Sequence, residues 1–249
     1  MSEAIPVSLP RLAIHVCYHK CMTVYFERVM KQVANHLQLA YQYVDRGAVL
    51  HDEVHLAMYP HGEIDLDALP DFHGTHLIRD PRDLLVSGYL YHLRTDEEWC
   101  AKPNPNHTSL PADVSYQQYL QDMDQEDGLL FEMNHVSGYV ISQIVDWDYH
   151  NPRFLELRFE QVMDNEAEVF GQVFEWYGLH GQALEEAVEI ALSRSLTQLP
   201  KDDSDAAHAR QGSYIGHWRD YFTPTIKQQF KQKFGSALIS LGYEQNQDW

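Results

Sequence analysis

Arg79 is the side chain whose position most strongly indicates chemistry. It follows a short apolar strand expected over residues 75–78, and Asp80 suits the N-cap of the helix that comes next. Ser87 lies in the same helix, nearly two turns further on. Open α/β sheets bind ligands where strands end, and a guanidinium can recognise a phosphate with two parallel hydrogen bonds. Arg79 is therefore expected either to bind an anion or to pair on the surface with Asp80 or Asp83.

Lys20 occupies a similar place earlier in the chain. The apolar run Leu12–Val16 predicts a buried strand, and apolar residues at helical spacing from Met22 to Leu37 predict a helix after it. A lysine between the two lies beside backbone N–H groups without helical partners and beside the positive end of the helix dipole. Thr23 can add a hydroxyl donor. The glycines of a nucleoside-triphosphatase P-loop are missing, so this loop alone predicts only an anion site.

A third basic position lies near the end of the chain. Arg210 precedes a short turn bracketed by Gly212 and Gly216, and Trp218 and Phe222 follow. We interpret Arg210 with Gly212 as a ligand clamp and the two aromatic side chains as packing residues. The alternative for the whole segment is a plain connection between helices.

The charge balance limits the class of ligand. The 249 residues carry 18 basic and 37 acidic side chains, which gives a formal net charge of −19. Such a field repels polyanions and argues against DNA or RNA as a partner. An anionic ligand therefore needs its basic contacts concentrated in one pocket.

The cysteine content and the lack of targeting signals suggest a compartment. Cys17, Cys21 and Cys100 cannot form a disulfide framework, which agrees with a reducing environment. No apolar run approaches the roughly 20 residues of a membrane-spanning helix, and the N-terminus lacks the features of a signal peptide. We expect a cytoplasmic protein without a membrane span, in which Cys17 and Cys21 pack near the Lys20 loop.

Strands that alternate with helices predict the fold class. Strands are expected over 12–16, 41–49, 75–78 and 154–158. Helices are expected after the first and third of these strands and over 113–124, 128–146, 164–178, 182–194 and 224–241. Residues 51–72 are expected to be mostly loop, and residues 95–111 an exposed loop that could cover an acceptor. The pattern predicts an α/β fold: one domain, residues 1–249, with a mostly parallel central sheet flanked by helices.

Three segments together resemble the sulfotransferases that use 3′-phosphoadenosine 5′-phosphosulfate (PAPS). They are Lys20 with Thr23, Arg79 with Ser87, and Arg210-Gln-Gly212 followed by Gly216, Trp218 and Phe222-Thr223. The segments occur in the family's order and span almost the whole chain. The triplet Arg158-Phe-Glu160 also resembles the family's strand ending. The resemblance implies the P-loop-like sulfotransferase fold, PAPS as sulfuryl donor and adenosine 3′,5′-bisphosphate (PAP) as product.

The resemblance also implies a division of labour among the site residues. The 5′-phosphosulfate would be held by Lys20, Cys21, Met22, Thr23 and Val24. The 3′-phosphate would be held by Arg79 and Ser87, with Arg210, Gln211 and Gly212 closing over it. Lys20 would further neutralise charge on the leaving phosphate, and the transfer needs no metal.

Several positions depart from the family pattern. The family usually has glycine where Met22 stands, serine or threonine at Val24, and tryptophan at Tyr25. Gln211 replaces the usual lysine. Because a glycine is lost, the loop backbone is more restricted than in other members. The departures predict a divergent member of the family.

A general base must accept the proton of the acceptor hydroxyl. By resemblance it is a histidine, or in some branches a glutamate, from the region before Arg79. His51, Glu53, His55 and His61 all lie there. The segment that begins at His55 is most similar to the family's His-Leu-Pro segment. We therefore expect His55 as the base and His51 as the next candidate.

Other functions stay open at this point. A non-catalytic homologue would keep the nucleotide contacts without a working base. A P-loop kinase would use Lys20 on ATP and Asp80 on magnesium. A metal site would use His51 and His55, which have the i, i+4 spacing of ligands on one helix face. For a sulfotransferase, the expected acceptor is a small-molecule, carbohydrate or lipid hydroxyl.

Overall fold

The computed structural model describes residues 9–104, 109–195 and 215–249. The chain divides into two compact units. The first contains residues 9–79 and 147–195, and the second contains residues 80–104, 109–146 and 215–249. The expected clamp at Arg210, Gln211 and Gly212 lies outside the described residues.

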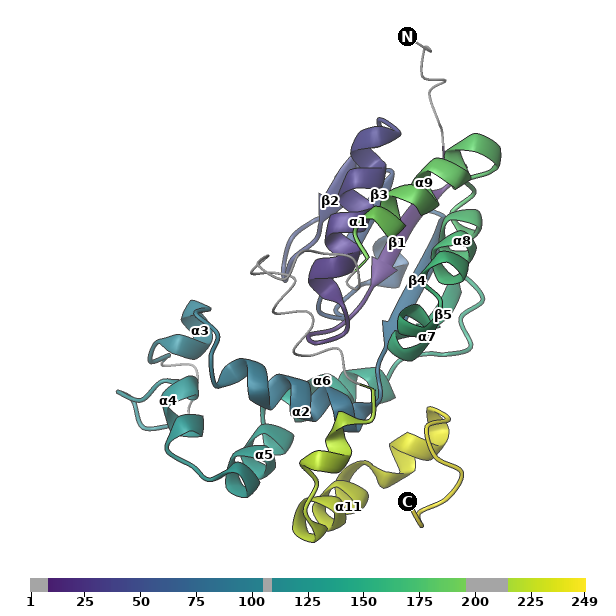
Figure 1. The fold of residues 1–249 in the computed structure, drawn as a ribbon. Coiled ribbons are helices and arrows are strands. Elements are labelled where there is room, and N and C mark those ends of the chain that lie inside the picture. The colour runs from purple at the N-terminus through teal and green to yellow at the C-terminus, as the bar shows by residue number, and fades with distance from the viewer. Residues whose placement is uncertain (1–8, 105–108, 196–214) are drawn as a thin grey trace. The chain divides into compact units, whose positions relative to one another are not determined.

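A five-stranded parallel sheet forms the centre of the first unit (Figure 1). Its strands are β1 (Leu12–Val16), β2 (Tyr41–Tyr43), β3 (Leu56–Tyr59), β4 (Phe72–Ile78) and β5 (Phe154–Arg158). They are ordered β2-β3-β1-β4-β5, and each neighbouring pair is parallel. The predicted α/β class with a parallel sheet is confirmed, and the predicted bounds of β1 and β5 are those observed.

Strand β3 corrects the prediction that residues 51–72 are mostly loop. Its four residues are all buried, and it lies between β1 and β2. A strand buried on both faces lacks the alternation of polar and apolar residues that marks a half-exposed one. This strand is also only four residues long, and Pro60 and Gly62 follow it closely, so the local sequence pattern favours a loop. The strand expected over 41–49 is present only as β2.

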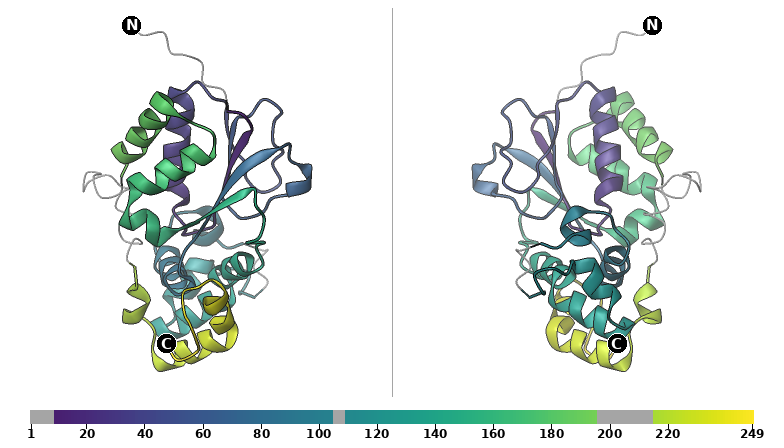
Figure 2. Two further views of the ribbon diagram at one scale, coloured as in Figure 1. Left: turned by 90° about the vertical axis from the view of Figure 1, so that its right-hand side faces the viewer. Right: turned by 90° about the vertical axis from the view of Figure 1, so that its left-hand side faces the viewer.

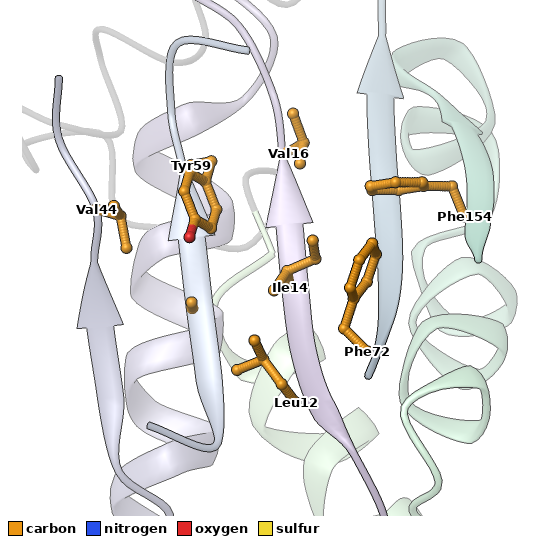
Figure 3. Packing of buried hydrophobic residues seen from close by; sticks show 8 residues of the cluster. Leu12, Ile14, Val16, Val44, Tyr59, Phe72 and Phe154 are labelled. Atoms are coloured by element: carbon orange, nitrogen blue, oxygen red, sulfur yellow. The ribbon is translucent and has the colours of Figure 1, made fainter. Parts of the chain in front are cut away.

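The two faces of the sheet are covered differently (Figure 2). One face carries α1 (Thr23–His36), α8 (Glu166–Trp176) and α9 (Gly181–Ser193). There Phe26 of α1 stacks on His15 of β1 with ring centroids 4.2 Å apart. The other face holds a buried cluster that includes Leu12, Ile14, Val16, Val44, Tyr59, Phe72 and Phe154 (Figure 3). In this unit, connecting segments that contribute Leu50, Val54, Ile64, Leu66, Leu69 and Trp147 cover that cluster.

The second unit is helical in its described part. It contains α2 (Pro81–His92), α3 (Glu98–Ala101), α4 (Tyr116–Gln121), α5 (Gln125–Asn134), α6 (Val136–Val145), the 3₁₀ helix η2 (His217–Asp220) and α11 (Pro224–Ser240). The fully buried carboxylate of Glu132 accepts hydrogen bonds from His92, Tyr116 and Ser137, which ties α2, α4, α5 and α6 together. No helix in the described ranges is long and apolar enough to cross a membrane.

Candidate functional site

The direction of chain travel across the sheet reverses between β1 and β4. After β1 the chain continues to β2 and β3 on one side, and after β4 it continues to β5 on the other. The carboxyl ends of β1 and β4 are neighbours, because Val16 pairs with His76 in the register. Open α/β sheets bind ligands at such an edge. Lys20 follows β1 here, and Arg79 follows β4.

The loop between β1 and α1, residues 17–22, is here called the anion loop. Lys20 has φ of 66° and Met22 has φ of 56°, so both adopt the left-handed conformation. This conformation costs a non-glycine residue about 1–2 kcal/mol. A glycine adopts a positive φ without this cost, so Met22 carries backbone strain that a glycine here would avoid.

Tyr18 organises the hydrogen bonds of the anion loop. Its carbonyl accepts the N–H of Cys21 at 2.9 Å and the hydroxyl of Thr23 at 2.9 Å. Cys17 donates its thiol to the Thr23 hydroxyl at 3.6 Å, and burial raises the pKa of Cys17 to about 12. The hydroxyl of Thr23 is therefore part of the loop's own structure, and the thiol stays protonated near neutral pH.

Helix α1 begins without a side-chain cap. Met22 occupies the N-cap, makes no side-chain cap hydrogen bond, and no acidic residue lies in the first turn. Val24 in that turn is 56% exposed. The first N–H groups of an uncapped helix need an external acceptor, and the helix dipole favours an anion there. This end of α1 therefore suits a phosphate or sulfate group.

Arg79 joins the end of β4 to the anion loop. It is only 3% exposed, and its Nη1 donates to the carbonyl of Lys20 at 3.3 Å. The guanidinium carbon lies 4.1 Å from the ring centroid of Phe159, the first residue of α7 (Phe159–Asp164). The structure thus brings Arg79 to the Lys20 carbonyl and places the Phe159 ring against the guanidinium. The sequence pattern alone does not indicate this contact of Phe159.

Arg79 does not lie on the surface, because its side chain is buried. Asp80 instead caps α2 and binds Arg82 through both carboxylate oxygens, at 3.0 Å to Nε and 2.7 Å to Nη2. Arg82 also pairs with Glu244. The carboxylate of Asp80 is therefore occupied, which argues against its expected magnesium role in a kinase.

Ser87 lies in α2 with a buried hydroxyl. The residue is 6% exposed, and its Oγ has no hydrogen-bond partner in the described part of the chain. A buried hydroxyl in this state is costly unless a ligand or water satisfies it. One turn earlier, Asp83 accepts the N–H groups of Gly216 at 2.6 Å and Trp218 at 2.9 Å. Asp83 thereby anchors the segment that follows Arg210 in the chain to the helix that carries Ser87.

His55 does not lie at the edge of the sheet that carries the anion loop. It precedes β3, and Leu56 pairs with Ala13, so His55 lies level with the start of β1. The length of β1 from that level to its carboxyl end is about 13 Å, at roughly 3.3 Å per residue. The Nδ1 of His55 accepts the N–H of Ala40 at 3.1 Å. This position argues against His55 as the base, because the full length of β1 lies between its level and the anion loop.

His51 is also held away from the anion loop. It is exposed, and its N–H donates to Gln42 of the edge strand β2 at 2.9 Å. Residues 51–55 do not form a helix, so the i, i+4 argument for a metal site does not apply to His51 and His55. Among the described residues, no three His, Cys, Asp or Glu side chains are grouped to hold a metal ion.

Of the candidate histidines His51, His55 and His61, His61 is the one whose neighbouring residue contacts the anion loop. It follows the carboxyl end of β3, and its Nε2 lies 3.2 Å from Oδ1 of Asp45. Burial, reinforced by Arg46 and opposed by Asp45, lowers the pKa of His61. The next residue, Gly62, has φ of 68° and packs on the Tyr18 ring, which a Cβ would overlap. Recognising β3 in the sequence would have singled out His61.

Comparison with known proteins agrees with this geometry. The model of the sulfotransferase domain family matches residues 75–242. A mouse sulfotransferase, SULT7A1, solved in complex with PAP, has a similar structure with a TM-score of 0.59 at 17% identity, over 92% of this chain and 84% of that chain. No curated protein sequence matches the chain.

Retinol dehydratase is a second structural neighbour. Its complex with androsterone and the inactive cofactor PAP has a TM-score of 0.57 at 15% identity, over 94% of this chain and 82% of that chain. Its complex with retinol and PAP has a TM-score of 0.56 at 13% identity, with the same coverage of 94% and 82%. Identities this low show a shared fold. The family match covers more than half of the sequence, and the chain therefore belongs to the sulfotransferase domain family.

Proposed function

We propose that this chain transfers a sulfuryl group from PAPS to a hydroxyl acceptor. The observation that carries the proposal is the meeting of the anion loop, the uncapped start of α1 and the buried Arg79 at one edge of the sheet. Lys20 and Arg79 would supply the positive charge that an anionic ligand needs on a protein whose net charge is −19. The structural neighbours that bind PAP support the same ligand for this chain.

Different residues would hold the two ends of the donor. Lys20 and the first N–H groups of α1 would hold the 5′ phosphosulfate, with Cys21 to Val24 forming the turn. Arg79 would hold the 3′-phosphate, and the buried Ser87 hydroxyl would gain the acceptor that it lacks among the described residues. Arg210, Gln211 and Gly212 are proposed to close over the same phosphate.

Catalysis would come mainly from positioning and charge stabilisation. When bound, PAPS supplies an activated sulfuryl group. The Lys20 ammonium and the α1 N–H groups would neutralise negative charge that develops on the leaving phosphate. Removing one preorganised donor of this kind costs about 10²–10³ in rate.

We propose His61 as the general base, in place of His55. Its lowered pKa keeps the imidazole neutral near pH 7, so it can accept a proton. Asp45 would orient the ring and stabilise the imidazolium that forms, as the aspartate of a catalytic triad does for its histidine. The acceptor class to test first is a small-molecule alcohol, because retinol dehydratase binds androsterone and retinol.

The test is sulfuryl transfer from labelled PAPS to a panel of alcohols, phenols, sugars and lipid alcohols. Lys20→Ala should lower kcat about 10²–10³-fold while weakening PAP binding less. Lys31→Ala is the matched control, because Lys31 is an exposed lysine on α1. His61→Ala should lower the rate about 10²–10⁴-fold with PAP affinity retained. Equal losses of turnover and PAP binding in Lys20→Ala would contradict its role at the leaving phosphate.

The second candidate is a non-catalytic nucleotide-binding homologue. The left-handed Met22 favours it, because a strained loop without the family's glycine departs from the usual catalytic form. A wild-type protein that binds PAP but transfers sulfuryl to no acceptor in the panel would select this candidate.

A further inference from the structure

A buried row of polar side chains leads from β5 through β4 to the anion loop. Glu156 of β5 accepts a hydrogen bond from Nδ1 of His76 at 2.5 Å. The Nε2 of His76 on β4 lies 2.8 Å from the hydroxyl of Tyr18 in the anion loop. The proposed chemistry uses none of these three side chains, and a polar row with two fully buried members needs an explanation.

The chemistry of the partners sets the direction of both hydrogen bonds. An ionised carboxylate can only accept, so Nδ1 of His76 carries the proton and Nε2 is left as an acceptor. The Tyr18 hydroxyl must therefore donate to His76. Burial lowers the pKa of His76, with Glu156 opposing, which keeps the neutral ring near pH 7. Burial likewise raises the pKa of Tyr18, so its hydroxyl remains a donor.

Packing fixes the rings that make this row. Trp147 stacks on His76 with ring centroids 4.0 Å apart and a 12° tilt, and its Nε1 donates to Glu156 at 3.1 Å. Tyr149 meets His76 edge-on at 5.6 Å. The Tyr18 ring is further confined by Gly62, where any Cβ would overlap it. The hydroxyl of Tyr18 is thus held at one place.

The carbonyl of Tyr18 links this fixed side chain to the rest of the anion loop. Its carbonyl is the acceptor for both the Cys21 N–H and the Thr23 hydroxyl. Those two contacts bracket Met22, whose left-handed backbone leads into α1. The position of Tyr18 therefore sets the position of the carbonyl that these two donors share.

We propose that Tyr18 is a positioning residue of the anion loop, and that the Glu156–His76 pair behind it preorganises the loop for an anionic ligand. This inference rests on the proposed function for the identity of the ligand. A strained loop that is already held in its binding conformation loses less free energy on binding than one that must be ordered.

The same unit offers a matched control on the opposite face of the sheet. Tyr177 is a buried tyrosine whose hydroxyl lies 2.5 Å from the Thr75 hydroxyl and donates to the carbonyl of Ile14 at 2.9 Å. These partners belong to β4 and β1. Tyr177→Phe therefore removes a buried hydroxyl of the same kind, with partners in the strands.

The experiment compares Tyr18→Phe, His76→Phe, His76→Gln and Tyr177→Phe with wild type. Calorimetry measures PAP affinity, and hydrogen exchange measures protection of the Cys21 amide without ligand. Tyr18→Phe and His76→Phe should each weaken PAP binding roughly three- to tenfold and speed Cys21 exchange, since one buried hydrogen bond is lost. His76→Gln should keep most of the affinity, because its carboxamide can accept from Tyr18 and donate to Glu156. Tyr177→Phe should lower thermal stability and leave PAP affinity unchanged.

The outcomes separate the positioning role of Tyr18 from the proposed function. If wild type binds PAP and Tyr18→Phe binds it equally tightly, the positioning role is overturned and the proposed function stands. If wild type does not bind PAP, the proposed function fails, and unchanged Cys21 exchange in Tyr18→Phe then overturns the positioning role separately. A loss in His76→Gln as large as in His76→Phe, or an equal loss in Tyr177→Phe, would also overturn it.

Discussion

Helices α1 and α2 both follow a strand of the sheet in the chain, but they begin in opposite ways. Asp80 caps α2, Pro81 takes its first position, and Asp83 adds an acidic side chain to its first turn. Helix α1 begins at a left-handed Met22 with no side-chain cap and no acidic residue in its first turn. The start of α2 is thus satisfied by its own sequence, whereas the start of α1 has no side-chain cap, and we propose that an anion binds there.

The arginines next to α2 show the same contrast. Arg79 and Arg82 are each 3% exposed. Arg82 is neutralised by Asp80 and Glu244, and its guanidinium lies 4.2 Å from the ring centroid of Trp218. Arg79 contacts a backbone carbonyl and the ring of Phe159. The two carboxylates account for the charge of Arg82, and contact between Arg79 and the ligand is our proposal.

Replacing the two arginines should give the largest and most different effects. Arg79→Ala should weaken PAP binding about 100-fold, because a bidentate charge-assisted contact is lost. Arg82→Ala should lower the free energy of unfolding by about 3 kcal/mol, because it leaves carboxylates partly buried and unpaired. Calorimetric titration and urea unfolding of both variants measure the contrast. Equal PAP affinity of Arg79→Ala and wild type would contradict the proposed contact between Arg79 and the ligand.

Giving α1 an acidic side chain of its own should make it resemble α2. Val24→Asp places a carboxylate in the first turn at an exposed position, so PAP affinity should fall more than tenfold through repulsion. Stability should stay the same or rise by about 0.3–1 kcal/mol, since the dipole favours this charge. Val24→Asn is the uncharged control. The comparison fails if Val24→Asp binds PAP as tightly as Val24→Asn does.

The strain at the start of α1 should be measurable. Met22→Gly should raise the free energy of unfolding by about 1 kcal/mol and keep PAP affinity, because glycine adopts a positive φ without steric cost. Gln38→Gly is the matched control, since Gln38 has φ of 58° beyond the other end of α1. It should give a similar gain in stability. A loss of stability in Met22→Gly would show that the methionine side chain contributes more than its backbone costs.

Low pH should lower the free energy of unfolding by a smaller amount, through His15, which packs on Phe26 of α1. Burial, with a contribution from His76, lowers the pKa of His15 to about 3, whereas the unfolded chain titrates near 6.5. Because the unfolded state binds a proton that the folded state excludes, stability should fall as pH decreases below about 6.5. From pH 7 to 6 this one group contributes a loss of about 0.7 kcal/mol. Urea unfolding at several pH values checks this, and an equally steep fall in His15→Phe would contradict the assignment.

The sequence predicts the parts of the fold that rest on local patterns. Leu12–Val16 and Phe154–Arg158 are apolar enough to mark β1 and β5 with their observed bounds. The order of Lys20 and Arg79 along strand-to-helix turns predicts that both reach one edge, which the register of β1 and β4 confirms. The loss of glycine at Met22 also points to the strain that the structure shows.

The rest depends on contacts between distant segments. The sequence neighbours of His55 favour it as the base, but the register of β3 with β1 places it at the other edge of the sheet. His61, after the carboxyl end of β3, is then the better candidate. Phe159 stands in the triplet Arg158-Phe-Glu160, and only the fold places its ring against the Arg79 guanidinium. His76 lies on the same face of β4 as Phe72. A polar residue in an apolar row is a sequence signal for a buried hydrogen bond.

The central claim is that separate cationic points receive the two ends of one doubly phosphorylated nucleoside. Calorimetric titration of the wild-type protein with PAP, and then with adenosine 5′-phosphate and adenosine 3′-phosphate, tests it most directly. We predict one PAP bound per chain, at least tenfold more tightly than either monophosphate, since each end contributes charge-assisted hydrogen bonds of its own. Absence of PAP binding, or equal affinity for all three nucleotides, would contradict the claim.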